Sequence, residues 1–178
     1  MRMRSISFAL FFVALVVLGP PGGRAAHALD EIVGQARAVS GDTIKIKSID
    51  DGKTRRIRLY GVMAPDRRQH CETQNGESVN CGYKAFDALD TMIRRKRMTC
   101  VDLENDSTGQ LTGTCYLGDK ILNSLVVRDG WALAYIEETA DFLGLEERAR
   151  AAGKGIMIYR FEKPWIWRAE QEKAKNGN

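Results

Sequence analysis

The sequence predicts a small α+β domain built on a closed or nearly closed β-barrel. Short segments rich in β-branched residues, joined by tight turns, fill residues 31–60 and return at 98–117. Segments with helical spacing interrupt them and recur late in the chain. Several strands combined with separate helices are typical of α+β barrels. Because no internal repeat or low-complexity linker is present, we expect one domain over residues 29–168.

The first three strands form a meander. "IVGQARAVS" and "TIKIKSI" alternate in part between apolar and polar residues. The tetrapeptide Asp50-Asp51-Gly52-Lys53 is a hairpin turn that leads into "TRRIRLYGV". A polar loop follows over residues 66–82.

The first helix is predicted over residues 83–96, since its apolar residues recur at helical spacing in "YKAFDALDTMIRRK". "MTCVDLEND" and "LTGTCYL" are then two strands around a turn at 107–110. A short helix fits 121–130, where Gly130 ends it, and "WALAYI" is a further strand. The last helix fits 144–155, and residues 169–178 are expected to be a charged, frayed tail.

Residues 1–28 have the order of a secretory signal peptide. Arg2 and Arg4 precede an apolar run over residues 6–18, and the segment ends in Ala26-His27-Ala28. The alternative is a membrane anchor, but the run is short for a bilayer span. We therefore expect a mature chain that begins near Leu29, has no membrane anchor, and is periplasmic or secreted.

The net charge of +4 depends partly on that segment. Its removal takes away three arginines and leaves 24 basic against 23 acidic residues. Any surface for an anionic partner must therefore be local. Candidates are residues 55–58, Arg67 with Arg68, and "RRKR" at 94–97; the alternative for each is an ordinary solvated face.

Four cysteines lie in the expected mature chain: Cys71, Cys81, Cys100 and Cys115. Export favours disulfides, and four cysteines allow three pairings, among which the sequence alone does not choose. The local pairing, Cys71 with Cys81 and Cys100 with Cys115, closes two short loops. Zinc is the weaker alternative because there is no CxxC motif and only His70 lies nearby.

Six segments together resemble one known family. They are "SGDTIKI", "RLYGVMAP", "CGYKAFDAL", "DGWALAY", "LEERARAAGKGI" and "PWIWR". In this order and approximate spacing they resemble the thermonuclease, or staphylococcal-nuclease-like, family in its secreted two-disulfide branch. The resemblance implies a five-stranded OB-fold β-barrel with three helices and a Ca²⁺-dependent nuclease site.

Some site positions of the family are matched in this chain. The resemblance implies Asp42 as a metal ligand, the Ala64 backbone carbonyl as another, and Arg58 as a catalytic cation. Asp42 could instead be a turn residue beside Gly41, and Arg58 could pair with a neighbouring acid. Tyr135 matches a nucleotide-contacting tyrosine, with a half-buried barrel aromatic as the alternative.

Other positions depart from the family pattern. Met63 stands where the family has a second metal-binding aspartate, and a thioether is a poor ligand for a hard calcium ion. Asp66 replaces the glutamate base and is one methylene shorter, which retracts the carboxylate by about 1 Å. Gln110 replaces the second catalytic arginine and carries no charge to stabilise a transition state.

These departures favour an exported domain whose nuclease site has decayed, a pseudoenzyme. Within the branch the chain is similar to the ExoI-like group named for succinoglycan biosynthesis, which implies an auxiliary role in making or exporting an acidic polysaccharide. The main alternative is a residual Ca²⁺-dependent phosphodiesterase acting on single-stranded DNA or RNA. A third is an interaction module that uses the tryptophans of "PWIWR", although such tryptophans more often pack the last segment onto the barrel. We expect a monomer whose partner is an anionic polymer, either acidic polysaccharide or single-stranded nucleic acid, and consider calcium doubtful.

Overall fold

A computed structural model describes residues 31–177 of the 178-residue chain. The predicted signal peptide lies outside the described residues. Within them, no helix combines the length and apolar character needed to cross a membrane.

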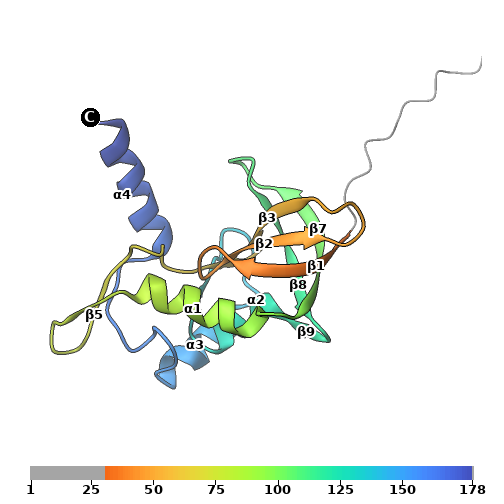
Figure 1. The fold of residues 1–178 in the computed structure, drawn as a ribbon. Helices are drawn as coiled ribbons and strands as arrows, with labels where there is room; N and C mark the ends of the chain where they lie inside the picture. Colours follow the sequence, from red (N-terminus) through yellow and green to blue (C-terminus); the bar gives the residue numbers. More distant parts are fainter. Residues whose placement is uncertain (1–30, 178) are drawn as a thin grey trace, which may run out of the picture.

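Five strands form the barrel (Figure 1). In chain order they are β1 (Glu31–Ala38), β2 (Thr43–Ser48), β3 (Thr54–Leu59), β7 (Arg97–Asn105) and β8 (Leu111–Leu117). The hydrogen-bonded order is β3-β2-β1-β7-β8, and β3 closes the circle by pairing with β8 in parallel. All other pairings in the circle are antiparallel, so the barrel is mixed. The predicted five-stranded α+β barrel is confirmed.

Alternation along the strands builds the core. In β2, Ile44 and Ile46 are fully buried while Lys45 and Lys47 between them are exposed. Successive side chains of a strand point to opposite faces, so one face fills the barrel and the other meets solvent. Ile57 and Leu59 of β3 and Met98 of β7 complete the same core.

Within residues 31–177, four helices, not the predicted three, accompany the barrel. They are α1 (Cys81–Ile93), α2 (Leu122–Arg128), α3 (Leu143–Ala151) and α4 (Pro164–Asn176). The first three correspond to the predicted helices, with shifted ends. Helix α1 begins two residues earlier than predicted because the Asn80 side chain caps it, accepting a hydrogen bond of 2.8 Å from the Tyr83 amide.

The fourth helix corrects the expectation of a frayed tail, since α4 continues through residues 169–176. Pro164 stands in its first turn, where a proline is well tolerated, and is buried. In Figure 1, α4 extends away from the barrel with only its first turns close to it. Trp165 packs against the small cluster of Leu133, Ala149 and Met157, which anchors that end. The sequence favours packing of the "PWIWR" tryptophans onto the domain, and Trp165 follows that expectation.

Five two-residue strands connect the larger elements. They are β4 (Val62–Met63), β5 (Cys71–Glu72), β6 (Ser78–Val79), β9 (Lys120–Ile121) and β10 (Leu133–Ala134). β5 and β6 form a small hairpin within the predicted polar loop. β10 is what remains of the predicted strand over 131–136, and it pairs with β4 so that Met63 lies opposite Leu133.

The two disulfides follow the local pairing. Cys71 is bonded to Cys81, and Cys100 to Cys115. The second pair joins residues directly opposite one another in β7 and β8, whereas the first fastens the β5–β6 hairpin to the start of α1. Zinc is thereby excluded at these cysteines, since all four are bonded. Two disulfides are typical of extracytoplasmic proteins.

We expect the double substitution Cys100→Ala with Cys115→Ala to lower the free energy of unfolding by about 3 kcal/mol, since the bridge spans 15 residues. Urea unfolding of the oxidised proteins would measure the change. The matched control, Cys71→Ala with Cys81→Ala, should cost somewhat less, about 2.7 kcal/mol, and should also make residues 70–82 sensitive to protease. The prediction would be contradicted if the variant without Cys100 and Cys115 were as stable as the natural chain.

Candidate functional site

The turn between β1 and β2 holds a fully buried carboxylate, that of Asp42. Its Oδ1 accepts hydrogen bonds from Ser40 Oγ at 2.7 Å and Thr43 Oγ1 at 2.9 Å. Its Oδ2 accepts from the Ala64 amide at 2.9 Å and from Arg168 Nη2 at 2.7 Å. Asp42 is therefore saturated with donors, and one of these donors carries a full positive charge.

Gly41 explains how this turn comes so close to its neighbours. A Cβ at this position would lie 2.6 Å from Ala64 Cβ and 2.7 Å from Ala85 Cβ. Only glycine lets the turn pack against both Ala64, which directly follows β4, and helix α1. The "SGDT" motif thus places Asp42 against Ala64.

Arg168 comes from α4 and lies among the three positions that the sequence predicts as metal ligands. Its Nη2 donates to Asp42 Oδ2 and, at 3.0 Å, to the Ala64 carbonyl oxygen. Its Nη1 lies 3.7 Å from the sulfur of Met63. The structure therefore brings Asp42, Met63 and Ala64 together, but around a guanidinium group.

This arrangement does not fit a calcium ion. Calcium takes six to eight oxygen ligands, and these three residues offer one carboxylate, one carbonyl and a sulfur. The guanidinium already uses the carboxylate and the carbonyl, and its charge would repel a divalent cation. Across residues 31–177 no group of three or more His, Cys, Asp or Glu side chains is arranged to hold a metal.

The buried pair also sets the ionisation of Asp42. Burial alone would raise the pKa of this carboxyl, but the charge and hydrogen bond of Arg168, with those from Ser40 and Ala64, outweigh it. The pKa of Asp42 is consequently held below its usual value, and the residue is charged at neutral pH. The pKa of Arg168 is raised in turn, chiefly by Asp42, and Asp66 adds to the effect.

Arg58 is held by two carboxylates. It lies on β3 where that strand meets β8, and both oxygens of Glu138 accept from its guanidinium. Asp106 Oδ2 accepts from the same group at 3.2 Å. Glu138 is fixed further by the Gly61 amide, 2.7 Å from its Oε2. Arg58 is therefore paired with neighbouring acids, which was the alternative to a catalytic role in the sequence.

Asp66 stands at the rim of the site, with about a third of its side chain exposed (34%). Its Oδ1 accepts from the Arg68 amide at 3.0 Å and from Arg68 Nε at 3.4 Å. Gly82 lets helix α1 start against this turn, because a Cβ there would overlap the Asp66 carbonyl. The carboxylate is close enough to influence Arg168 but is occupied by its own turn.

Gln110 and Tyr135 are engaged elsewhere. Gln110 Nε2 donates to the carbonyls of Arg56, at 3.3 Å, and Leu111, at 3.2 Å, so the amide folds back on the barrel. The half-buried Tyr135 packs on Trp165, with ring centroids 5.4 Å apart, and donates to Glu137 at 2.5 Å. That hydrogen bond is the main reason its pKa is raised to about 12.

Sequence reasoning missed three members of this cluster: Arg168, Glu138 and Asp106. Arg168 is the last residue of "PWIWR", a segment in which sequence reasoning assigned a role only to the tryptophans. Trp165 of the same segment packs onto the domain. Glu138 directly follows Glu137 after the "AYI" segment, and two adjacent acids there were the available signal.

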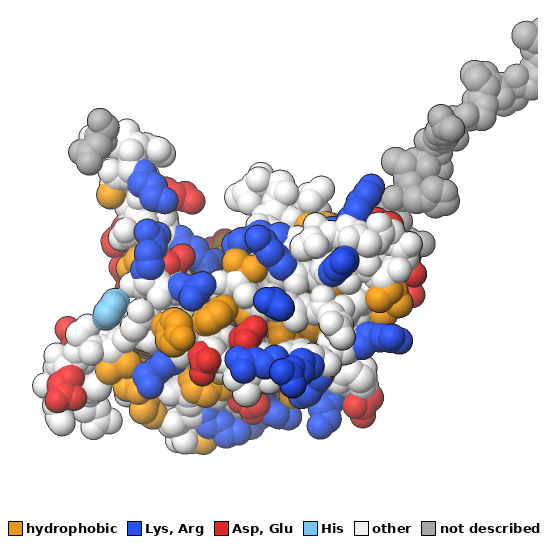
Figure 2. Space-filling model, viewed as in Figure 1, with side chains coloured by type: hydrophobic (Ala, Val, Ile, Leu, Met, Phe, Trp, Pro, Cys, Tyr) orange, Lys and Arg blue, Asp and Glu red, His pale blue; other side chains and the backbone are white. Residues whose placement is uncertain are grey.

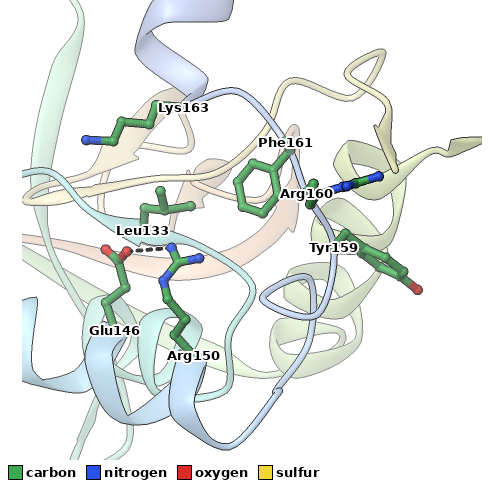
Figure 3. A pocket seen from close by; sticks show the side chains of 7 residues that line it. All are labelled: Leu133, Glu146, Arg150, Tyr159, Arg160, Phe161 and Lys163. Carbon is green, nitrogen blue, oxygen red and sulfur yellow. Dashed lines mark hydrogen bonds and ion pairs between the residues drawn. The ribbon is translucent and has the colours of Figure 1, made fainter. Parts of the chain in front are cut away.

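A separate cavity of about 560 Å³ lies between α3 and residues 159–163 (Figure 3). Two charged residues that line the cavity neutralise one another, since Arg150 Nη2 donates to Glu146 Oε1 at 2.9 Å. Glu146 also accepts from the Ala134 amide, so it supports β10. No residue of the predicted site lines this cavity.

Removing the Arg168 guanidinium should destabilise the fold, because the Asp42 carboxylate would then be buried without a charge partner. We expect Arg168→Met to lower the free energy of unfolding by about 3 kcal/mol at pH 7, the scale for breaking a buried ion pair. In the natural chain the pKa of Asp42 is lowered, so its contribution is present above the unfolded pKa and lost as pH falls through the folded one. In the variant, burial without a cation raises that pKa, so the deficit should shrink as pH falls from about 7 to 4.

Urea unfolding at several pH values would measure this difference. Arg160→Met is the matched control, because Arg160 is exposed and pairs only with the exposed Glu72. A deficit for Arg168→Met that is as small as the control's, or that does not change with pH, would show that the pair does not stabilise the fold.

Comparison with known proteins agrees with this architecture. The family model described as "Staphylococcal nuclease homologue" matches residues 56–158. "Succinoglycan biosynthesis protein ExoI" of Rhizobium meliloti (strain 1021) is 32% identical over 155 residues, covering 84% of this chain and 71% of the relative. An "Uncharacterized endonuclease" of Escherichia coli O157:H7 is 29% identical over 136 residues, covering 74% and 81% of the two chains. The chain belongs to the staphylococcal nuclease homologue family.

Proposed function

We propose that this protein is an exported member of the family that does not hydrolyse phosphodiesters by a calcium route and instead binds an acidic polysaccharide, as an auxiliary in exopolysaccharide biosynthesis or export. The observation that carries the first half is the position of Arg168. Its guanidinium lies against Asp42, the Ala64 carbonyl and Met63, the three positions at which the family resemblance implies a metal.

An arginine can replace the charge of a metal ion for the fold but not its chemistry. Hydrolysis of a phosphodiester needs a cation that polarises the phosphate and a carboxylate that activates water. A guanidinium is always protonated and donates hydrogen bonds, but it does not coordinate water, and this one already donates to Asp42 and to the Ala64 carbonyl. The reaction would therefore lack the cation that polarises the phosphate.

The surrounding charges also disfavour a phosphodiester. Four carboxylates, those of Asp42, Asp66, Asp106 and Glu138, gather with three cations, Arg58, Arg68 and Arg168. The cluster is therefore net negative before any substrate arrives. Arg58 would have to leave Glu138 and Asp106 to reach a phosphate, and Gln110 supplies no charge.

The polysaccharide half is supported by similarity and by architecture. A relative that is 32% identical is named for succinoglycan biosynthesis. OB-type barrels bind oligosaccharides as well as oligonucleotides. The expected signal peptide and the two disulfides favour a location outside the cytoplasm, where such a polymer is assembled and exported.

The alternative function is a residual calcium-dependent nuclease acting on single-stranded DNA or RNA. Asp42, Arg58 and Asp66 retain matching positions, and another relative is named as an endonuclease. This function requires Arg168 to withdraw from Asp42 when calcium and substrate bind.

Cleavage of single-stranded DNA in calcium distinguishes the two functions. We expect the chain from Leu29 to be inert, and the double variant Met63→Asp with Gln110→Arg to remain inert, because Arg168 still occupies the metal position. Adding Arg168→Ala should produce calcium binding with a dissociation constant of about 1 mM or tighter. Cleavage should then rise at least about a hundredfold above background.

Calorimetry with calcium and gel assays of cleavage would measure both effects. Arg160→Ala in place of Arg168→Ala is the matched control, since it removes an exposed arginine that the site does not use. Calcium-dependent cleavage by the natural chain would overturn the proposal in favour of the residual nuclease.

A further inference from the structure

The outer face of the first three strands carries a row of like charges. Arg37 of β1 lies directly opposite Lys45 of β2, and Lys45 lies opposite Arg56 of β3. All three side chains are exposed on the solvent face. Like charges at directly opposite positions of antiparallel strands destabilise a sheet, so the row is a cost to the fold.

A groove runs beside this row, between β1 and β2 and the helix α1. Its volume is about 1010 Å³, and six of its lining residues are basic: Arg37, Lys45, Lys47, Arg67, Arg94 and Arg95. Asp90 is the one acidic residue among them, and it pairs with Arg94 at 2.9 Å. Figure 2 shows lysine and arginine side chains gathered over this side of the molecule.

Among the residues that the structure describes, the remaining cations of this surface form no ion pair. Within residues 31–177, ion pairs engage eight other arginines, including Arg58 and Arg168, but none of Arg37, Lys45, Lys47, Arg56, Arg67 and Arg95. The domain therefore separates its charges: the cluster around Asp42 is net acidic, whereas the face of β1, β2 and β3 is basic and uncompensated. Such a surface attracts a polyanion.

The aromatic residue of the groove is already covered. The Arg67 guanidinium lies 3.9 Å from the ring centroid of Phe86 and 5.9 Å from that of Tyr83. Proteins that hold single-stranded nucleic acid combine a basic groove with aromatic rings on which bases stack. In this groove the Arg67 guanidinium instead lies over the face of the Phe86 ring, which favours a ligand recognised by its charges.

We infer that an acidic polysaccharide binds along this groove, with its carboxylates on the Arg37, Lys45 and Arg56 row and on Lys47 and Arg67. This inference rests on the proposed function and specifies the surface that performs it. Adjacent strands lie about 5 Å apart and alternate residues of one strand about 7 Å apart, so the row offers closely spaced cations to successive charged sugars. The polymer would cross the barrel face without entering the cluster around Asp42.

The test compares two triple variants with the same loss of charge. The first changes the row, as Arg37→Gln, Lys45→Gln and Arg56→Gln. The control changes three exposed cations on α3 and α4, as Arg148→Gln, Lys173→Gln and Lys175→Gln. Binding to purified succinoglycan, to neutral dextran and to single-stranded DNA would be measured by calorimetry at low and at physiological salt.

We expect the natural chain to bind succinoglycan but not dextran, more tightly at low salt because the contacts are ionic. The row variant should bind at least about tenfold more weakly, while the control binds as the natural chain does. Circular dichroism and urea unfolding would establish that both variants are folded.

Three results would overturn the inference. Equal binding by the row variant and the control would place the polymer elsewhere and leave the proposed function standing. Tighter binding of DNA than of succinoglycan, lost in the row variant, would make the groove a nucleic-acid surface. Failure to bind any polyanion, together with calcium-dependent DNA cleavage, would refute both the groove and the proposed function.

Discussion

The ion pair between Asp42 and Arg168 is the interaction on which the site depends. It joins the first turn of the barrel to the last helix, 126 residues away, through a hydrogen bond of 2.7 Å. The carboxylate is fully buried, so the fold tolerates it only with a charge partner. The first turns of α4 are in consequence part of the site, although most of that helix extends away from the barrel (Figure 1).

A guanidinium in this position alters what the site can do. A divalent ion can bind and leave, coordinates several oxygens and activates water, whereas an arginine is attached to the chain and offers directed N–H donors. Met63 is compatible with the second arrangement, since its sulfur lies beside the guanidinium at 3.7 Å and need not supply a charge. In the function we propose, Met63 in place of a carboxylate ligand and the presence of Arg168 are two parts of one change in chemistry.

Charge is distributed unevenly over the barrel. Four carboxylates gather with Arg58, Arg68 and Arg168. Within residues 31–177, by contrast, Arg37, Lys45, Lys47 and Arg56 on the outer face of β1, β2 and β3 form no ion pair. Basic and acidic residues nearly balance over residues 29–178, yet the barrel has a local basic surface, to which we assign the anionic polymer of our proposal. The closed barrel makes this separation possible, because alternate residues of β2 face the core and the solvent.

The sequence by itself determined the barrel strands and three of the helices, since alternation and turns are local signals. The grouping of Asp42, Met63 and Ala64 was implied by the resemblance of ordered motifs to the family. The sequence left the disulfide pairing open, and it predicted a frayed tail where α4 forms. Only the tertiary structure decided that Arg168 meets Asp42 and that Glu138 and Asp106 hold Arg58. These contacts join residues 48 to 126 positions apart, and no local pattern encodes them. They arise because barrel closure and the packing of Trp165 bring distant segments together.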